Sequence, residues 1–254
     1  MGSLVLLVVA AVWVAVLVPP LLRSRLENRP NSSVSDFRDQ LSSLVTTVDD
    51  DGGGLTETEL RATAALVVGA GFETTVNLIG NGAALLFAHP DQRRVLAEDP
   101  SLWPNAVDEV LRVDPPVQRT GRRARRHTTV HGVPVAEGEW LVLLLAGANR
   151  DPQVFPDPHE FDVARPNARD HVAFASGIHF CLGAALARME GEVALQALFE
   201  RFPDLGPACS GRRRGTVILR GYESLPVVLR AATREPGTAA RSASTPDRAT
   251  RCRG

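Results

Sequence analysis

The stretch that decides the fold runs from Phe174 to Arg188 and reads FASGIHFCLGAALAR. Within it, Cys181 lies between Gly177 and Gly183, directly before an apolar segment with helical spacing. The first turn of a helix has free N–H groups and a positive dipole end, and both stabilise a negatively charged sulfur. The stretch therefore predicts a thiolate at the mouth of a helix, with glycines that allow a sharp turn and the close approach of a flat ligand.

The helix after the cysteine is expected to bury one stripe of apolar residues that recur at three- and four-residue steps: Leu182, Leu186, Met189, Val193 and Ala197. The dipeptide Phe202-Pro203 is expected to end this helix. A lone cysteine in an apolar setting is more often a small buried side chain than a ligand. Cys181 by itself would therefore not indicate a site, and the surrounding pattern decides.

The pattern Phe-x-x-Gly-x-His-x-Cys-x-Gly, followed by Leu-Ala-Arg, resembles the cysteine-ligand loop of the cytochrome P450 family. This resemblance implies that Cys181 is the thiolate ligand of haem iron. It also implies that four further residues of the loop contact the haem: Phe174, Gly177, His179 and Gly183. Ala175 departs from the family, which usually has glycine at this position.

A second motif lies inside a long predicted helix. The segment Thr56–Glu59 has the spacing of a capping box, and the helix is expected over residues 56–87. Within it, the segment Ala70–Thr75 reads by itself as a kink with a solvated face, because glycine inside a helix costs about 1 kcal/mol relative to alanine. The same segment resembles the oxygen-binding helix of the family, which implies that Glu73 and Thr74 deliver protons to bound dioxygen.

Two charges three residues apart, Glu109 and Arg112, lie on one face of a predicted helix that begins near Pro104. Most such pairs are exposed and contribute little to stability. The pair resembles the Glu-x-x-Arg pair of the family, which implies that it is buried and structural. The family completes this pair with an arginine from the loop before the cysteine, and Arg165 is the candidate.

Residues 119–126 contain five arginines. Such a run is usually a solvated basic patch, and without interleaved aromatic residues it does not support nucleic-acid binding. The resemblance implies instead that Arg122, together with His179, contacts the haem propionates, since the planar guanidinium can bond both oxygens of a carboxylate. Short strands are expected at 130–135 and 140–144.

The first 22 residues contain no charged side chain, and three arginines follow within residues 23–29. This predicts a membrane-spanning helix with the body of the protein on the cytoplasmic side. The alternative is a buried helix or strand of a cytoplasmic protein. Residues 23–54 read as a linker, and residues 231–254 as a disordered tail.

The chain has 44% hydrophobic residues and a net charge of −1, which suits a packed core and favours neither nucleic acid nor an acidic partner. The resemblance predicts a mainly α fold with small β hairpins over residues 55–230, equivalent to the C-terminal half of the cytochrome P450 fold, behind one N-terminal hydrophobic helix. It implies a haem-thiolate monooxygenase that uses haem b, dioxygen, a small organic substrate and a separate ferredoxin or reductase. The alternative is a non-catalytic, membrane-tethered remnant that binds haem weakly or not at all.

Overall fold

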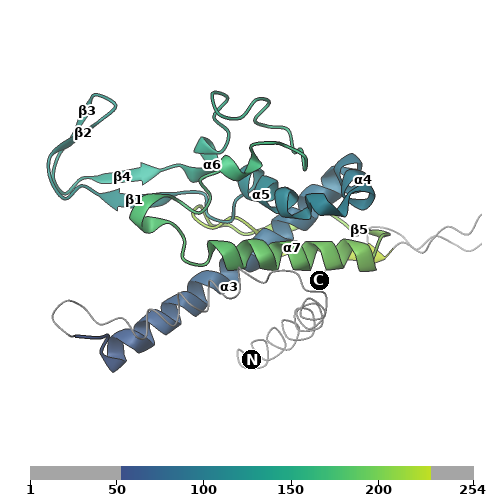
Figure 1. The fold of residues 1–254 in the computed structure, drawn as a ribbon, viewed down its shortest axis with the longest axis horizontal. Coiled ribbons are helices and arrows are strands. Elements are labelled where there is room, and N and C mark those ends of the chain that lie inside the picture. The colour runs from purple at the N-terminus through teal and green to yellow at the C-terminus, as the bar shows by residue number, and fades with distance from the viewer. Residues whose placement is uncertain (1–52, 230–254) are drawn as a thin grey trace, which may run out of the picture.

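The computed structural model of the 254-residue chain describes residues 53–229 (Figure 1). Three of the predicted segments fall wholly or almost wholly outside this range: the membrane helix at 1–22, the linker at 23–54 and the tail at 231–254. The predictions for these segments therefore stay predictions.

Helices make up most of the described chain, as predicted. The longest is α3 (Glu57–Ala88), followed by α4 (Pro90–Glu98), α5 (Trp103–Val113), the short α6 (Leu145–Ala148) and α7 (Ala184–Arg201). Three 3₁₀ turns, η1 (Pro100–Leu102), η2 (Ala168–Asp170) and η3 (Gly177–His179), lie between them. The predicted capping box is confirmed, because Thr56 accepts the N–H of Glu59 at 3.3 Å and Glu59 accepts the N–H of Thr56 at 2.9 Å.

The strands form four small antiparallel sheets of two strands each within residues 53–229. The pairs are β1 (Thr120–Arg123) with β4 (Trp140–Leu143), β2 (Thr128–Val130) with β3 (Val133–Val135), β5 (Leu205–Pro207) with β8 (Val227–Leu229), and β6 (Arg212–Arg213) with β7 (Tyr222–Ser224). The predicted strand over 130–135 is wrong as a single strand. His131 and Gly132 have φ values of 46° and 80°, and this left-handed pair turns the chain back into a hairpin.

The core lies where α3, α5 and α7 pack together, and all three helices contribute buried apolar side chains to it: Leu78, Leu86, Trp103, Val107, Val110, Leu195 and Phe199. Two glycines allow the close approach of α3 and α7. A Cβ atom on Gly82 of α3 would lie 2.6 Å from Leu195 of α7, and one on Gly191 of α7 would lie 3.0 Å from Leu78 of α3. In each helix, therefore, a glycine packs directly against a leucine of the other helix.

The buried face of α7 differs from the predicted stripe. The helix buries Ala184, Glu190, Gly191, Ala194, Leu195 and Phe199. The five residues of the predicted stripe are instead only partly buried or, in the case of Leu182, 41% exposed. Apolar side chains occur on several sides of α7, so their spacing does not single out one face. The face that packs is the one that carries Gly191, because the missing side chain there admits Leu78 and Val107.

The first half of α3 projects away from the other helices (Figure 1). In this half of the helix, Leu66 is 69% exposed and Val68 is 71% exposed. Within residues 53–229, α3 is the one helix long and apolar enough to cross a membrane, but the core helices of soluble proteins meet the same criterion. Its composition is therefore weak evidence for a membrane span.

Candidate functional site

The cysteine loop is closed by its own backbone. The N–H of Cys181 donates to the carbonyl of Phe174 at 3.0 Å, and η3 forms the turn between them. Gly177 has a φ of 64°, which glycine adopts without strain. Ala175 has a φ of 58°, a left-handed conformation that is costly for alanine. The position where the family usually has glycine is thus one where the backbone favours glycine.

Cys181 lies three residues before α7, at the helix mouth that the sequence predicts. Burial by the loop raises the pKa of its thiol, although the residue as a whole is exposed. The N–H of Gly183 and the positive charge of Arg188 act in the opposite direction and lower this pKa. The helix terminus therefore stabilises the thiolate, but in this structure burial has the larger effect.

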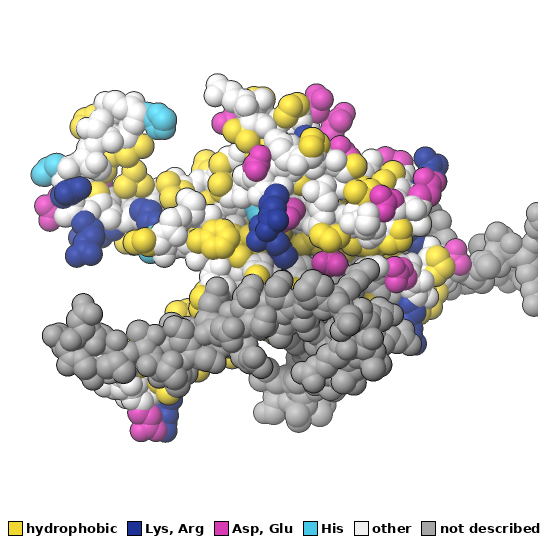
Figure 2. All heavy atoms as spheres, viewed as in Figure 1, with side chains coloured by type: hydrophobic (Ala, Val, Ile, Leu, Met, Phe, Trp, Pro, Cys, Tyr) yellow, Lys and Arg dark blue, Asp and Glu magenta, His cyan; other side chains and the backbone are white. Residues whose placement is uncertain are grey.

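Exposed apolar residues flank Cys181 along the loop. Ile178 is 99% exposed, Phe180 55% and Leu182 41%. Hydrophobic side chains also reach the surface beside the loop that leads into α7 (Figure 2). A single thiol among apolar side chains, on a loop opened by a left-handed glycine, could hold the iron of a flat, largely apolar cofactor such as haem.

Glu73 and Thr74 occupy successive positions on α3, which is unbroken through the Gly71 region. The hydroxyl of Thr74 donates to the carbonyl of Ala70, one turn earlier, at 2.6 Å. The carboxylate of Glu73 forms an ion pair with Arg214 at 2.9 Å, and both side chains are partly exposed. Their direct contacts are therefore within α3 and with the segment that follows β6, and not with the cysteine loop.

Arg122 and His179 lie on different elements and do not contact each other in the described structure. Arg122 is on β1 and donates to Thr120 Oγ1 at 3.2 Å and to the carbonyl of Gly121 at 2.8 Å. His179 is exposed at the end of η3. Both side chains are held at most by local contacts, which leaves them available to a ligand.

The predicted triad of Glu109, Arg112 and Arg165 is confirmed. Glu109 and Arg112 are fully buried, and their two hydrogen bonds measure 2.7 and 2.8 Å. Arg165 reaches the same carboxylate at 3.2 Å. Arg112 also donates to the carbonyls of Asn149, Pro158 and Glu160, so this group fixes the loop before the cysteine.

Two of the buried acidic residues that were not predicted from the sequence lie beside this site. Asp108, next to Glu109, accepts hydrogen bonds from two residues on either side of the cysteine, His171 and Arg188. Glu190, on the packed face of α7, is 6% exposed, and burial raises its pKa from 4.5 to about 7 against a smaller opposing effect of a hydrogen bond with Thr75. In the sequence, Asp108 is distinguished only by its position next to Glu109. Glu190 is distinguished only as an acidic residue within an apolar helix.

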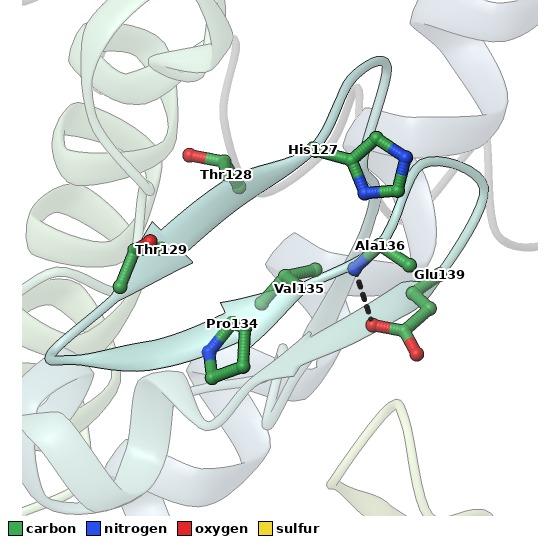
Figure 3. A pocket seen from close by; sticks show the side chains of 7 residues that line it. All are labelled: His127, Thr128, Thr129, Pro134, Val135, Ala136 and Glu139. Carbon is green, nitrogen blue, oxygen red and sulfur yellow. Dashed lines mark hydrogen bonds between the residues drawn. The ribbon is translucent and has the colours of Figure 1, made fainter.

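The β2–β3 hairpin borders an open hollow of about 540 Å³ (Figure 3). It is lined by residues of the hairpin and of the chain just before β4: His127, Thr128, Thr129, Pro134, Val135, Ala136 and Glu139. Glu139 accepts the N–H of Ala136 across it at 2.8 Å. None of the predicted site residues lines this hollow, so it is separate from the cysteine loop.

Known proteins share the segments that build this site. Residues 101–204 match the family model described as Cytochrome P450. The chain is 52% identical over 208 residues to cytochrome P450 140 of Mycobacterium tuberculosis, an alignment that covers 82% of this chain and 47% of that protein. It is 46% identical over 194 residues to 6-deoxyerythronolide B hydroxylase of Saccharopolyspora erythraea, with 75% and 48% covered. The chain belongs to the cytochrome P450 family.

Solved cytochrome P450 structures agree with this fold. Cytochrome P450 PksS of Bacillus subtilis aligns with a TM-score of 0.69 and 38% identity, covering 77% of this chain and 53% of its own. The ligand-free P450 monooxygenase TamI aligns with a TM-score of 0.69 and 42% identity, covering 79% and 50%. This P450 chain spans about half the length of the curated relatives it matches.

Proposed function

We propose that this chain provides the thiolate side of a cytochrome P450 monooxygenase site, in which Cys181 would be the thiolate ligand of the iron of haem b. The observation that carries the proposal is the loop itself. It fixes Cys181 through the carbonyl of Phe174, places it three residues before α7, and sets its thiol beside the N–H of Gly183. That arrangement suits a thiolate at a helix terminus.

Haem, when bound, supplies the iron that activates dioxygen for transfer of one oxygen atom to an organic substrate. The chain binds and orients it. Gly177 and Gly183 would leave the loop free of side chains for a flat ring to approach, and Phe174 holds the loop through its carbonyl bond to Cys181. Arg122 and His179 provide positive or hydrogen-bonding groups for the two propionates.

Proton delivery falls to Glu73 and Thr74. The Thr74 hydroxyl uses its hydrogen to bond the carbonyl of Ala70, which leaves its oxygen lone pairs free to accept. Glu73 is partly exposed and can exchange protons with water, while Arg214 holds its carboxylate in place. A proton accepted by the Thr74 oxygen would be matched by release of its own hydroxyl hydrogen, so the hydroxyl would turn from the carbonyl of Ala70 toward the next acceptor as it passes the proton on.

The substrate is proposed to be a small organic molecule. Two matched relatives are named as hydroxylases, 6-deoxyerythronolide B hydroxylase and Vitamin D(3) 25-hydroxylase, which supports this class. Electrons would come from a separate ferredoxin or reductase, the partner that the resemblance to the family implies. The comparisons do not support attachment to a membrane, so the anchor predicted at 1–22 rests on the sequence alone.

The test is the carbon-monoxide spectrum of the reduced, haem-loaded protein, which reports thiolate ligation directly. We expect a thiolate-type spectrum from the parent chain and its loss in Cys181→Ser. Cys252→Ser serves as the control and should retain the spectrum. A thiolate-type spectrum that survives Cys181→Ser would refute the assignment.

The second candidate is a remnant that binds haem weakly and does not turn over. It is favoured by one observation: apolar side chains of α3, such as Leu66 and Val68, stay exposed in a chain that spans about half the length of the relatives it matches. Peroxide-driven oxidation by monodisperse, haem-loaded protein separates the two candidates. Turnover at about 1 s⁻¹ or faster, the ordinary range for enzymes, would favour the monooxygenase.

A further inference from the structure

One carboxylate on α5 joins the two ends of the cysteine loop. Asp108 is 6% exposed, and its Oδ1 atom accepts a hydrogen bond from Nε of Arg188 at 2.6 Å. The same Oδ1 atom lies 3.1 Å from Nε2 of His171. His171 precedes Cys181 by ten residues and Arg188 follows it by seven, so the contacts of Asp108 span the whole loop.

The hydrogen bonds of His171 determine its tautomer. Its Nδ1 atom accepts the N–H of Ala173 at 3.1 Å, so Nε2 carries the hydrogen and donates it to Asp108. The imidazole is fully buried and lies against the ring of Phe174, with 5.6 Å between ring centroids. His171 therefore connects α5 to Phe174, whose carbonyl holds the N–H of Cys181.

Arg188 connects the other end of the loop to the same ring. Its guanidinium lies over Phe174 at 4.6 Å from the ring centroid, while Nε donates to Asp108. Burial acts to raise the pKa of Asp108, but the hydrogen bonds from His171 and Arg188 outweigh it, so the pKa is lowered and the carboxylate is charged. The ring of Phe174 thus contacts two side chains that both bind the Asp108 carboxylate.

We propose that Asp108 is a positioning residue for Cys181: through His171 and Arg188 it holds Phe174, and through the carbonyl of Phe174 it holds the thiol at the mouth of α7. The neighbouring Glu109 has a different task, since its contacts are with Arg112, Arg165 and the N–H of Asp162. The value of this positioning for iron ligation rests on the proposed function, but the geometry is a property of the chain itself.

The test measures the Cys181 thiol in the haem-free chain, so it succeeds or fails independently of haem binding. Thiolates are the species that react with iodoacetamide. The rate of alkylation of Cys181 is followed by mass spectrometry of its peptide across about pH 7 to 10, which brackets the ordinary thiol pKa. For Asp108→Asn, which loses a charge-assisted hydrogen bond, we expect the loop to open more often and the rate at pH 8 to rise about tenfold. The pH profile should shift toward that of an unburied thiol.

The matched control is Asp114→Asn. Asp114 is also 6% exposed and also pairs with two groups, Arg213 at 2.8 Å and Arg220 at 2.6 Å, but neither belongs to the cysteine loop. It should leave the alkylation rate within about twofold of the parent, since its contacts are independent of the loop. Equal acceleration in both variants, or no acceleration in Asp108→Asn, would overturn the proposal.

Because Asp108→Asn could fail to fold, His171→Gln provides a second route to the same question. It removes one of the two links from Asp108 to Phe174 and leaves the other, the ion pair between Asp108 and Arg188, in place. We expect acceleration of several-fold, between the parent and Asp108→Asn. A rate unchanged from the parent in folded His171→Gln would overturn the proposal equally.

Discussion

Glu190 should make the stability of this protein depend on pH in the neutral range. The carboxyl group lies on the packed face of α7 and forms no ion pair within residues 53–229. Burial raises its pKa from 4.5 to about 7, with a hydrogen bond to Thr75 opposing the rise. Above pH 7 the folded protein must hold a charge in its core, whereas the unfolded chain holds the same charge in water.

The sign and size follow from the two pKa values. The folded state binds the proton more tightly than the unfolded state, so the stabilising contribution is complete below about pH 4.5 and is lost as the pH rises through 7. Since one pKa unit corresponds to about 1.4 kcal/mol, Glu190 should lower the free energy of unfolding by about 3 kcal/mol between pH 4.5 and pH 8. Glu190→Gln cannot ionise and should remove this loss.

Urea unfolding followed by tryptophan fluorescence measures the effect, because Trp103 is 3% exposed in the core. The difference in unfolding free energy between Glu190→Gln and the parent should grow from near zero at pH 4.5 to about 3 kcal/mol in favour of the variant at pH 8. Glu200→Gln, at an exposed position of the same helix, is the control and should show no growing difference. If the difference for Glu190→Gln stays constant across this range, the carboxyl group is hydrated and the reasoning from burial fails.

Three further predictions concern stability and location. Glu109→Ala leaves Arg112 buried without its partner, so urea unfolding should show a loss of about 3–5 kcal/mol, and an unchanged midpoint would contradict the structural role of the pair. Ala175→Gly relieves the left-handed backbone and should raise the free energy of unfolding by about 0.5–1 kcal/mol, whereas a decrease in the same assay would show that the backbone is not strained there. Deletion of residues 1–22 should move the protein from the membrane fraction to the soluble fraction, and persistent membrane association would rule out an anchor in that segment.

Features set by neighbours in the sequence were predictable. The capping box at Thr56–Glu59 and the end of α3 at residue 88 follow from side chains within a few positions of each terminus. The pair of Glu109 and Arg112 follows from helical spacing, and its burial and its third member, Arg165, followed from the family resemblance. The hairpin at His131-Gly132 was missed because a histidine in the left-handed region is not evident from an alternating apolar pattern.

Features set by packing between distant segments were not predictable. The buried face of α7 depends on Gly191 meeting Leu78 of α3, more than 100 residues away, and no periodicity within α7 reports that contact. The roles of Asp108 and His171 depend on a hydrogen bond across 63 positions. Family resemblance supplied the ligand-loop residues, but it does not reveal which side chains hold that loop in place.

Helices α3 and α7 approach closely where Gly82 meets Leu195 and Gly191 meets Leu78, so a change in the angle between them would move their distant ends the most. Thr74 lies eight residues before Gly82, about 12 Å along α3, and Cys181 lies ten residues before Gly191. A change of about 5° in the angle between the helices would therefore displace Thr74 by about 1 Å, enough to cost a catalytic site about a hundredfold in rate. Small residues at the crossing thus control the spacing of groups that they never touch.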